Sequence, residues 1–461
     1  MDYSAANTVL WGIVIQLGLI AGAILFSQFL YRVFPPLQKA MLPAAVLAGF
    51  LLLAAKLLGL PLDDELMEML VFHGIALGFI AMSLRVPAHP RDRTEKLTGL
   101  KSGAVIVSTY LVQGAAGLLI SLLLSHTLMP GLFHAAGMLL PMGYGQGPGQ
   151  ANNVGSAYEA LGFVGGRSYG MAIAAAGYLV ACTVGVVILN ILRHRGLLTP
   201  AQNVAPAQER ARDYFASEEG GSVSASIDAM SVQAAMVLLV YLATFLVTRA
   251  LTAGLAAAAP GVAATVSPLL WGFNFIIGSA LAIALRVLLG QRKTQRPSRA
   301  LQYQNNYLLG RISGFFFDLM IVAGIASIEP SDVRALLLPF LLMAVVGGVV
   351  TWLHLRFVCA AVYPEYRYQG LISMFGMLTG TISSGILLLR EIDPELSTPA
   401  ANNLVTGSSF GIILGAPILV LVSLAAKSEP LCWLTLGLVL VYLCLLLLII
   451  FRLGNRRDRK A

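Results

Sequence analysis

The sequence predicts an all-α polytopic membrane protein, built as an inverted 5+5 transmembrane repeat with two re-entrant hairpins plus one extra C-terminal helix. Three observations predict this fold class: the composition, a series of long apolar runs, and a glycine pattern that occurs twice. Of the 461 residues, 57% are hydrophobic and only 11% are charged, whereas soluble chains carry about 25% charged residues. So few charges cannot cover a water-exposed surface, which excludes soluble, disordered and disulfide-built secreted proteins.

Eleven apolar runs are long enough to span a bilayer, which takes about 20 residues of helix. The first half contains Val9–Leu30, Leu42–Leu60, Leu66–Leu84, Ala104–Leu124 and Tyr169–Ile191. The second half contains Val232–Ala250, Val266–Leu289, Tyr307–Ile328, Ala335–Leu355, Leu404–Leu424 and Leu431–Phe451. No basic segment precedes the first run, which is too long for the core of a signal peptide. We therefore expect a retained helix there.

The only long polar stretch separates the two halves. It covers residues 192–230 and is rich in Ser, Glu, Gly and Arg, a composition typical of a flexible linker. The predicted divisions are a first repeat at 1–191, a cytoplasmic linker at 192–230, a second repeat at 231–424, and an extra span with a basic tail at 425–461.

Basic residues indicate the orientation of the spans. Lys and Arg cluster in alternate connections, at 85–101, 193–212, 292–299 and 452–460, whereas an opposite connection carries Asp63, Asp64 and Glu65. Cytoplasmic loops are the ones enriched in Lys and Arg. We therefore expect the N-terminus outside and the C-terminus in the cytoplasm of a plasma (inner) membrane. The basic residues behind the net charge of +8 then serve to orient helices in the lipid bilayer, and no nucleic-acid partner is predicted.

This alternation of charge holds only if two apolar segments do not cross the membrane. They are Gly131–Gly162, between the fourth and fifth spans, and Gly370–Pro399, between the ninth and tenth. If either crossed fully, the basic clusters that follow would lie on the wrong side. Each segment is therefore predicted to be a re-entrant hairpin, the first from outside and the second from the cytoplasm.

The two predicted hairpins share a glycine pattern. GMLLPMGYGQGPGQ (137–150) and GLISMFGMLTGTIS (370–383) carry three glycines at the same spacing, with a constant offset of 233 residues: Gly137, Gly143 and Gly147 against Gly370, Gly376 and Gly380. With five spans and one hairpin in each half, entering from opposite sides, this predicts an inverted repeat. The alternative, in which these glycines form helix-packing faces of the G-x-x-x-G type, stays open.

Two broken segments at membrane depth indicate a hydrated binding cavity, because non-helical backbone is tolerated there only where protein or water satisfies it. The N-termini of half-helices suit an anionic substrate, and carbonyl and hydroxyl oxygens suit Na⁺. The candidate substrate-binding residues are Gly145, Gln146, Gly147, Gln150, Thr379, Thr381, Ser383, Ser384 and Arg390. The candidate Na⁺ ligands are Asn152, Asn153, Asp318, Asn402 and Asn403.

Several of these residues have alternative roles. Asp318 could bind Na⁺ or carry a proton, or it could pair with Arg311. Arg390 could bind a substrate carboxylate, or it could be an interfacial arginine or a partner of Glu391 or Asp393. One of the asparagines at 402 and 403 could serve only to cap the tenth span.

Motifs for enzymatic chemistry do not occur in the sequence. It contains no nucleophile elbow, P-loop or zinc motif, and its four cysteines are scattered singly, so neither a zinc site nor a disulfide framework is supported. We expect no enzyme activity and no cofactor, with Na⁺ as the coupling ion. An intramembrane transferase and a passive channel are the rivals from other classes.

The hairpin motifs resemble those of the glutamate:sodium symporter (ESS) family. The resemblance rests on the glycine-rich first hairpin, on LTGTISSGILLLREIDP in the second, and on the 5+5 arrangement, and it covers roughly Val9 to Leu424. At the tips this chain has Gly145, Gln146, Gly147 and Pro148, where the family commonly has Gly-His-Gly-Thr. In the second loop it has Gly380, Thr381, Ile382, Ser383 and Ser384 in place of Thr-Pro-Thr.

The resemblance implies a secondary transporter that imports glutamate, or a similar small anionic amino acid, together with Na⁺ by alternating access. It also implies a homodimer, with the site between two re-entrant loops of a moving core domain. The alternative is a symporter or exchanger of another organic anion, such as a hydroxycarboxylate, with proton coupling through Asp318 as one form of it.

Overall fold

The computed structural model describes residues 3–4, 7–35, 37, 42–86, 93–198, 223–292, 304–393 and 398–454. Every regular element in these ranges is a helix. Nine helices in the described part of the chain are long and apolar enough to cross a membrane. The predicted class, an all-α membrane-embedded protein with many spans, is therefore confirmed.

These nine helices correspond to nine of the eleven predicted spans. They are α1 (Thr8–Val33), α4 (Asp64–Leu84), α5 (Arg93–His126), α7 (Gly166–His194), α9 (Val223–Ala258), α12 (Asn306–Ala326), α14 (Leu337–Val362), α17 (Ala400–Ala425) and α18 (Glu429–Gly454). Of the predicted linker at 192–230, residues 192–194 are the end of α7 and 223–230 are the beginning of α9, while residues 199–222 lie outside the described ranges.

The other two predicted spans are wrong as continuous helices of full length. The run Leu42–Leu60 contains α3 (Ala44–Leu57), which has 14 residues and a length of about 21 Å, less than the hydrocarbon thickness of about 30 Å. Pro43 precedes its first turn, and Gly59, with φ +100°, follows its last. The run Val266–Leu289 is divided between α10 (Pro260–Gly272) and α11 (Asn274–Arg292). Gly272 and Asn274 stand on the two sides of this division, and glycine and asparagine are poor helix formers.

Both predicted hairpin segments are broken helices. The first contains a 3₁₀ turn, η1 (His134–Met138), a π-helical turn, η2 (Pro141–Gly145), and α6 (Pro148–Glu159). The second contains α15 (Arg367–Thr379) and α16 (Ile382–Arg390), which pack against each other; residues 394–397 of this segment are outside the described ranges. The sides from which these segments enter the membrane, and the inverted repeat itself, stay predictions.

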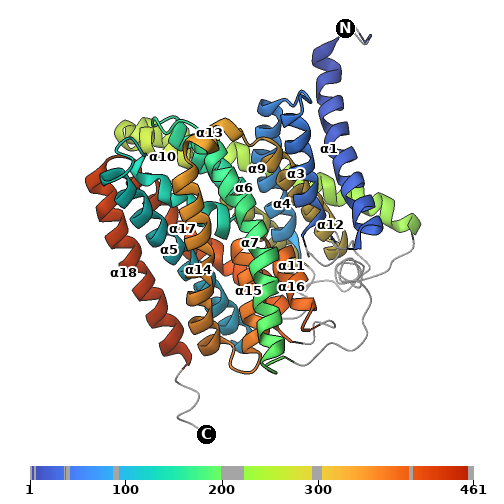
Figure 1. Ribbon diagram of the computed structural model, residues 1–461. Coiled ribbons are helices and arrows are strands. Elements are labelled where there is room, and N and C mark those ends of the chain that lie inside the picture. Colours follow the sequence, from blue (N-terminus) through green and yellow to red (C-terminus); the bar gives the residue numbers. More distant parts are fainter. Residues whose placement is uncertain are drawn as a thin grey trace. The chain divides into compact units, whose positions relative to one another are not determined.

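The chain folds into two compact units. One contains Met1–Glu68, Arg93–Ala207 and Ile321–Ala461. Within it, α5 contacts α14, α17 and α18 (Figure 1), and α7 contacts α6, α14, α15 and α16. The short helix α13 (Pro330–Ala335) contacts α7 and α14. This unit contains both broken segments, so helices from the two predicted halves pack together in it.

The other unit contains Met69–Asp92 and Gln208–Met320. Its core is formed by apolar side chains of α4, α9, α11 and α12, among them Ile80, Val240, Ala282 and Leu309. The hydroxyl of Ser313 donates to the carbonyl oxygen of Gly78 at 3.0 Å, because a glycine at that point of α4 lets α12 approach closely. This unit also mixes helices from both predicted halves.

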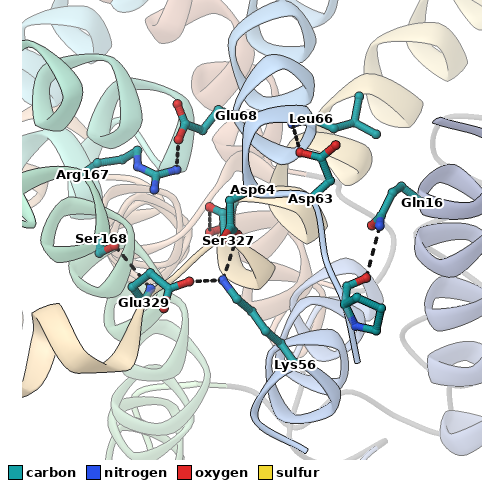
Figure 2. A network of polar contacts seen from close by, with 12 residues as sticks. Gln16, Lys56, Asp63, Asp64, Leu66, Glu68, Arg167, Ser168, Ser327 and Glu329 are labelled. Carbon is teal, nitrogen blue, oxygen red and sulfur yellow. Dashed lines mark hydrogen bonds and ion pairs between the residues drawn. The ribbon is translucent and has the colours of Figure 1, made fainter. Parts of the chain in front are cut away.

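A network of charged side chains fixes the first turn of α7 within the first unit (Figure 2). Lys56 of α3 pairs with Asp64 of α4 at 2.8 Å and also with Glu329, the residue before α13. The backbone N–H of Glu329 donates to the Ser168 hydroxyl at 3.3 Å, and Arg167 pairs with Glu68. Since Arg167 and Ser168 lie in the first turn of α7, the network holds in place the helix that contacts both broken segments.

Candidate functional site

Two helix N-termini begin at the two breaks. α6 begins at Pro148 after Gly147, and α16 begins at Ile382 after Thr381; the two starts are 382 − 148 = 234 residues apart, against the glycine offset of 233. Neither N-terminus has a side-chain cap. The N–H groups of a first helical turn have no partner within the helix, and they carry a partial positive charge that attracts anions.

The backbone at the first break is restricted to glycine. Gly147 has φ +87° and ψ −175°, a region of the Ramachandran map that essentially only glycine occupies. A Cβ atom at Gly147 would nevertheless have space, because its nearest neighbour would be the Tyr178 hydroxyl at 3.9 Å. This glycine is therefore required by the backbone conformation, not by close packing.

The two breaks share two neighbours, which brings them together. A Cβ atom at Gly177 of α7 would overlap the carbonyl oxygen of Thr379, at the end of α15, and would lie 3.1 Å from Tyr144 of η2. Gln113 of α5 donates from Nε2 to the Leu378 carbonyl at 2.9 Å, and its Oε1 lies 2.9 Å from the position of a Cβ atom at Gly145. Both breaks therefore lie against α5 and α7.

α14 anchors the same region. The amide of Gln113 also donates to the Thr351 hydroxyl at 2.8 Å, and the Tyr144 hydroxyl donates to the Ala344 carbonyl at 2.5 Å. These hydrogen bonds hold the backbone around the breaks in place.

Several buried polar atoms beside the breaks have no hydrogen-bond partner. Of the atoms of this kind in the described part of the chain, six belong to side chains at or next to the breaks: both amide atoms of Gln150, Oδ1 of Asn152, Oε1 of Gln113 and the hydroxyls of Thr381 and Ser384. The side chains of Gln150 and Ser384 are each only 2% exposed. An unsatisfied buried polar group costs about 1–3 kcal/mol, so a set of five such side chains indicates a place where water, an ion or a ligand binds.

The paired glycines differ in how closely they are packed. Gly143 and Gly376 are packing positions, since a Cβ atom at Gly143 would lie 2.8 Å from the Ala174 nitrogen, and one at Gly376 would lie 2.8 Å from the Gly385 Cα. Gly147 and Gly380 lie at the breaks themselves. Gly380 is also closely packed, since a Cβ atom there would lie 2.9 Å from the Ser384 Oγ and 3.0 Å from the Gly376 carbonyl oxygen, whereas one at Gly147 would have space. The packing interpretation therefore fits Gly143, Gly376 and Gly380 but not Gly147, and the binding interpretation stays a prediction.

Eight of the nine predicted substrate-binding residues lie at the breaks or in the first turn that follows them: Gly145, Gln146, Gly147, Gln150, Thr379, Thr381, Ser383 and Ser384. Thr379 uses its hydroxyl within the helix, donating to the Phe375 carbonyl at 2.8 Å. The side chain of Ser383 lies outside the described part. Arg390 is buried at 4% exposure at the opposite end of α16, about 13 Å along the helix from Thr381.

The predicted Na⁺ ligands are more scattered. Asn152 is 4% exposed, and Asn153 follows it on α6. At the start of α17, Asn402 is exposed, and Asn403 donates to the Tyr366 hydroxyl at 2.8 Å; no side chain caps α17, whose N-cap is Pro399.

Asp318 belongs to the second unit. Its side chain is exposed. The pairing with Arg311 is not seen among the described residues, where Arg311 instead lies over the Tyr307 ring at 5.2 Å. The breaks belong to the first unit, and the role of Asp318 as a Na⁺ ligand stays a prediction.

Sequence reasoning missed the two residues that join the breaks. Gln113 gave a signal, because it is an amide within the apolar run Ala104–Leu124 and polar groups inside spans are functional by default. Gly177 gave none, since it is one of 46 glycines and only the folded chain shows that it separates Thr379 from Tyr144.

The chain was compared with family models, with curated proteins and with solved structures. None of them matches. The likeness to the ESS family therefore stays a prediction that depends on the hairpin motifs.

Proposed function

We propose that the protein is a secondary transporter that imports glutamate, or a similar small anionic amino acid, together with Na⁺ by alternating access. The observation that supports this most is the pair of uncapped helix N-termini at two adjacent breaks, next to buried polar atoms without partners. The N–H groups and the amide of Gln150 can donate to substrate carboxylates. The amide and hydroxyl oxygens can replace part of the hydration shell of Na⁺.

In this proposal Gln150, Thr381 and Ser384 bind the substrate, and Asn152 and the Gln113 oxygen are Na⁺ ligands. Arg390 lies at the far end of α16, and in this proposal it does not bind the substrate. The transporter works as a homodimer in the plasma (inner) membrane, with the C-terminus in the cytoplasm. Substrate release follows when the rest of the protein moves relative to the breaks, as inverted-repeat transporters do.

The proposal predicts that purified protein in liposomes takes up labelled glutamate several times faster under an inward Na⁺ gradient than in K⁺ alone, because the bound Na⁺ couples the ion gradient to the solute. Empty liposomes and a Na⁺ ionophore are the controls. Uptake that is indifferent to Na⁺ but follows a pH gradient would contradict the proposal and favour a proton-coupled carrier. Binding of a hydroxycarboxylate instead of glutamate would change the substrate class.

A second prediction concerns Gln150→Leu. Leucine has a similar volume and removes two unsatisfied buried atoms, each of which costs about 1–3 kcal/mol. We therefore expect a variant that unfolds at the same temperature as the wild type or a higher one, and that has lost glutamate uptake. Thermal unfolding and uptake are measured on the same preparation.

The matched control is Asn190→Leu, which changes an exposed amide on α7. It should leave uptake intact. A Gln150→Leu variant that is much less stable, or that transports normally, would mean that Gln150 has a structural role and that the breaks do not form the binding site.

A further inference from the structure

A groove of about 280 Å³ lies where the ends of α7 and α14 meet the first turn of α15. Three arginines line it: Arg195 directly follows α7, Arg356 lies near the end of α14, and Arg367 is the first residue of α15. The volume is near the lower limit of small-molecule sites, about 300 Å³. It can therefore hold a headgroup but not a whole lipid.

The positive charges in this groove are not neutralised by neighbouring acids. Within the described ranges, none of the three arginines forms an ion pair, and the nearby Glu391 pairs with Arg193 at 3.2 Å instead. Nε of Arg367 is buried without a hydrogen-bond partner. Guanidinium groups bind phosphate oxygens in a bidentate manner, so the groove matches a phosphate group.

Apolar side chains continue from the groove along the outside of α7 and α14. Trp352 and Tyr368 line the groove beside the arginines, as these residue types do at headgroup level. Ile191, which lines the groove on α7, is 45% exposed; Val187, one turn before it, is 55% exposed, and Phe357, next to Arg356 on α14, is 68% exposed. A free phosphate would contact the arginines alone, whereas the acyl chains of a lipid would also cover these apolar side chains.

We propose that this groove binds an anionic phospholipid, with the phosphate on the three arginines and the acyl chains along the exposed side chains of α7 and α14. The charge pattern of the sequence assigns these helix ends to the cytoplasmic leaflet, where anionic lipids are attracted to basic residues. The inference is independent of the transported solute.

The test compares phosphatidylglycerol with phosphatidylcholine as additives to the purified full-length protein. Phosphatidylglycerol should raise the unfolding temperature and be retained in native mass spectra, since a ligand of the folded state stabilises it. Each of the single substitutions Arg195→Gln, Arg356→Gln and Arg367→Gln should weaken retention of the lipid about fivefold, because one arginine contributes roughly that factor to the affinity for an anionic lipid. Combined, they should abolish the difference between the two lipids.

The matched control is Arg452→Gln, which removes an exposed arginine at the end of α18 and should leave lipid retention unchanged. Equal stabilisation by both lipids, or unchanged retention in the single Arg356→Gln variant, would overturn the proposal. So would an equal effect of glycerol phosphate, which would make a soluble phosphate the ligand. Cross-linking of two chains through Val187→Cys would also overturn it, because a second copy of the chain would then cover the groove in place of a lipid.

Discussion

Gly147→Ala is expected to reduce Na⁺-driven glutamate uptake by at least about tenfold while the protein still inserts and remains folded. Alanine has space at this position, so the effect arises from the backbone, whose φ of +87° and ψ of −175° cost a non-glycine residue about 1–3 kcal/mol. Relief of this strain rotates the peptide before Pro148 and misaligns the N-terminus of α6. Uptake in liposomes and the elution profile of the purified protein measure the two quantities.

Gly162→Ala is the matched control for this variant. Gly162 also has a positive φ, +98°, and its Cβ would meet no atom within 4 Å, but it lies in the exposed turn after α6. A similar backbone cost should arise there without loss of uptake. If both variants lose uptake equally, the loss reflects global stability and Gly147 has no special role.

Gly177→Ala is expected to abolish uptake and to lower the free energy of unfolding by about 1–3 kcal/mol, the usual cost of overpacking. The added methyl group would overlap the Thr379 carbonyl and press on Tyr144, and so would push the two breaks apart. Because the obstacle is backbone, it cannot rotate away. Uptake and thermal unfolding are compared with those of the wild type.

The control lies two helical turns further along α7. Gly185→Ala would bring its methyl group to 2.7 Å from Cδ1 of Leu388, the end of a flexible side chain that can change rotamer. It should cost less than Gly177→Ala and retain uptake. Normal transport by Gly177→Ala would contradict the conclusion that close contact of the breaks across this glycine is needed.

The membrane class and most of the helices were predictable because they depend on local properties. Hydrophobic runs such as Tyr307–Ile328 must be helical in lipid, where each backbone polar group needs an internal partner. The breaks at Gly147 and Gly380 were also predictable, because a glycine-rich stretch weakens a helix locally. The lengths of the helices next to Pro43 and Gly272 were not predictable in this way. A hydrophobicity averaged over about 20 residues does not register a single residue that ends a helix.

The sequence by itself determined that the chain resides in a membrane, that two of its segments are interrupted, and which polar residues follow the interruptions. Only the tertiary structure decided that both breaks meet against Gln113 and Gly177, that Asp318 and the breaks belong to different units, and that three arginines far apart in the sequence line one groove. The physical reason is the range of the interactions: helix formation depends on neighbours within about four residues, whereas these contacts join residues up to 265 positions apart.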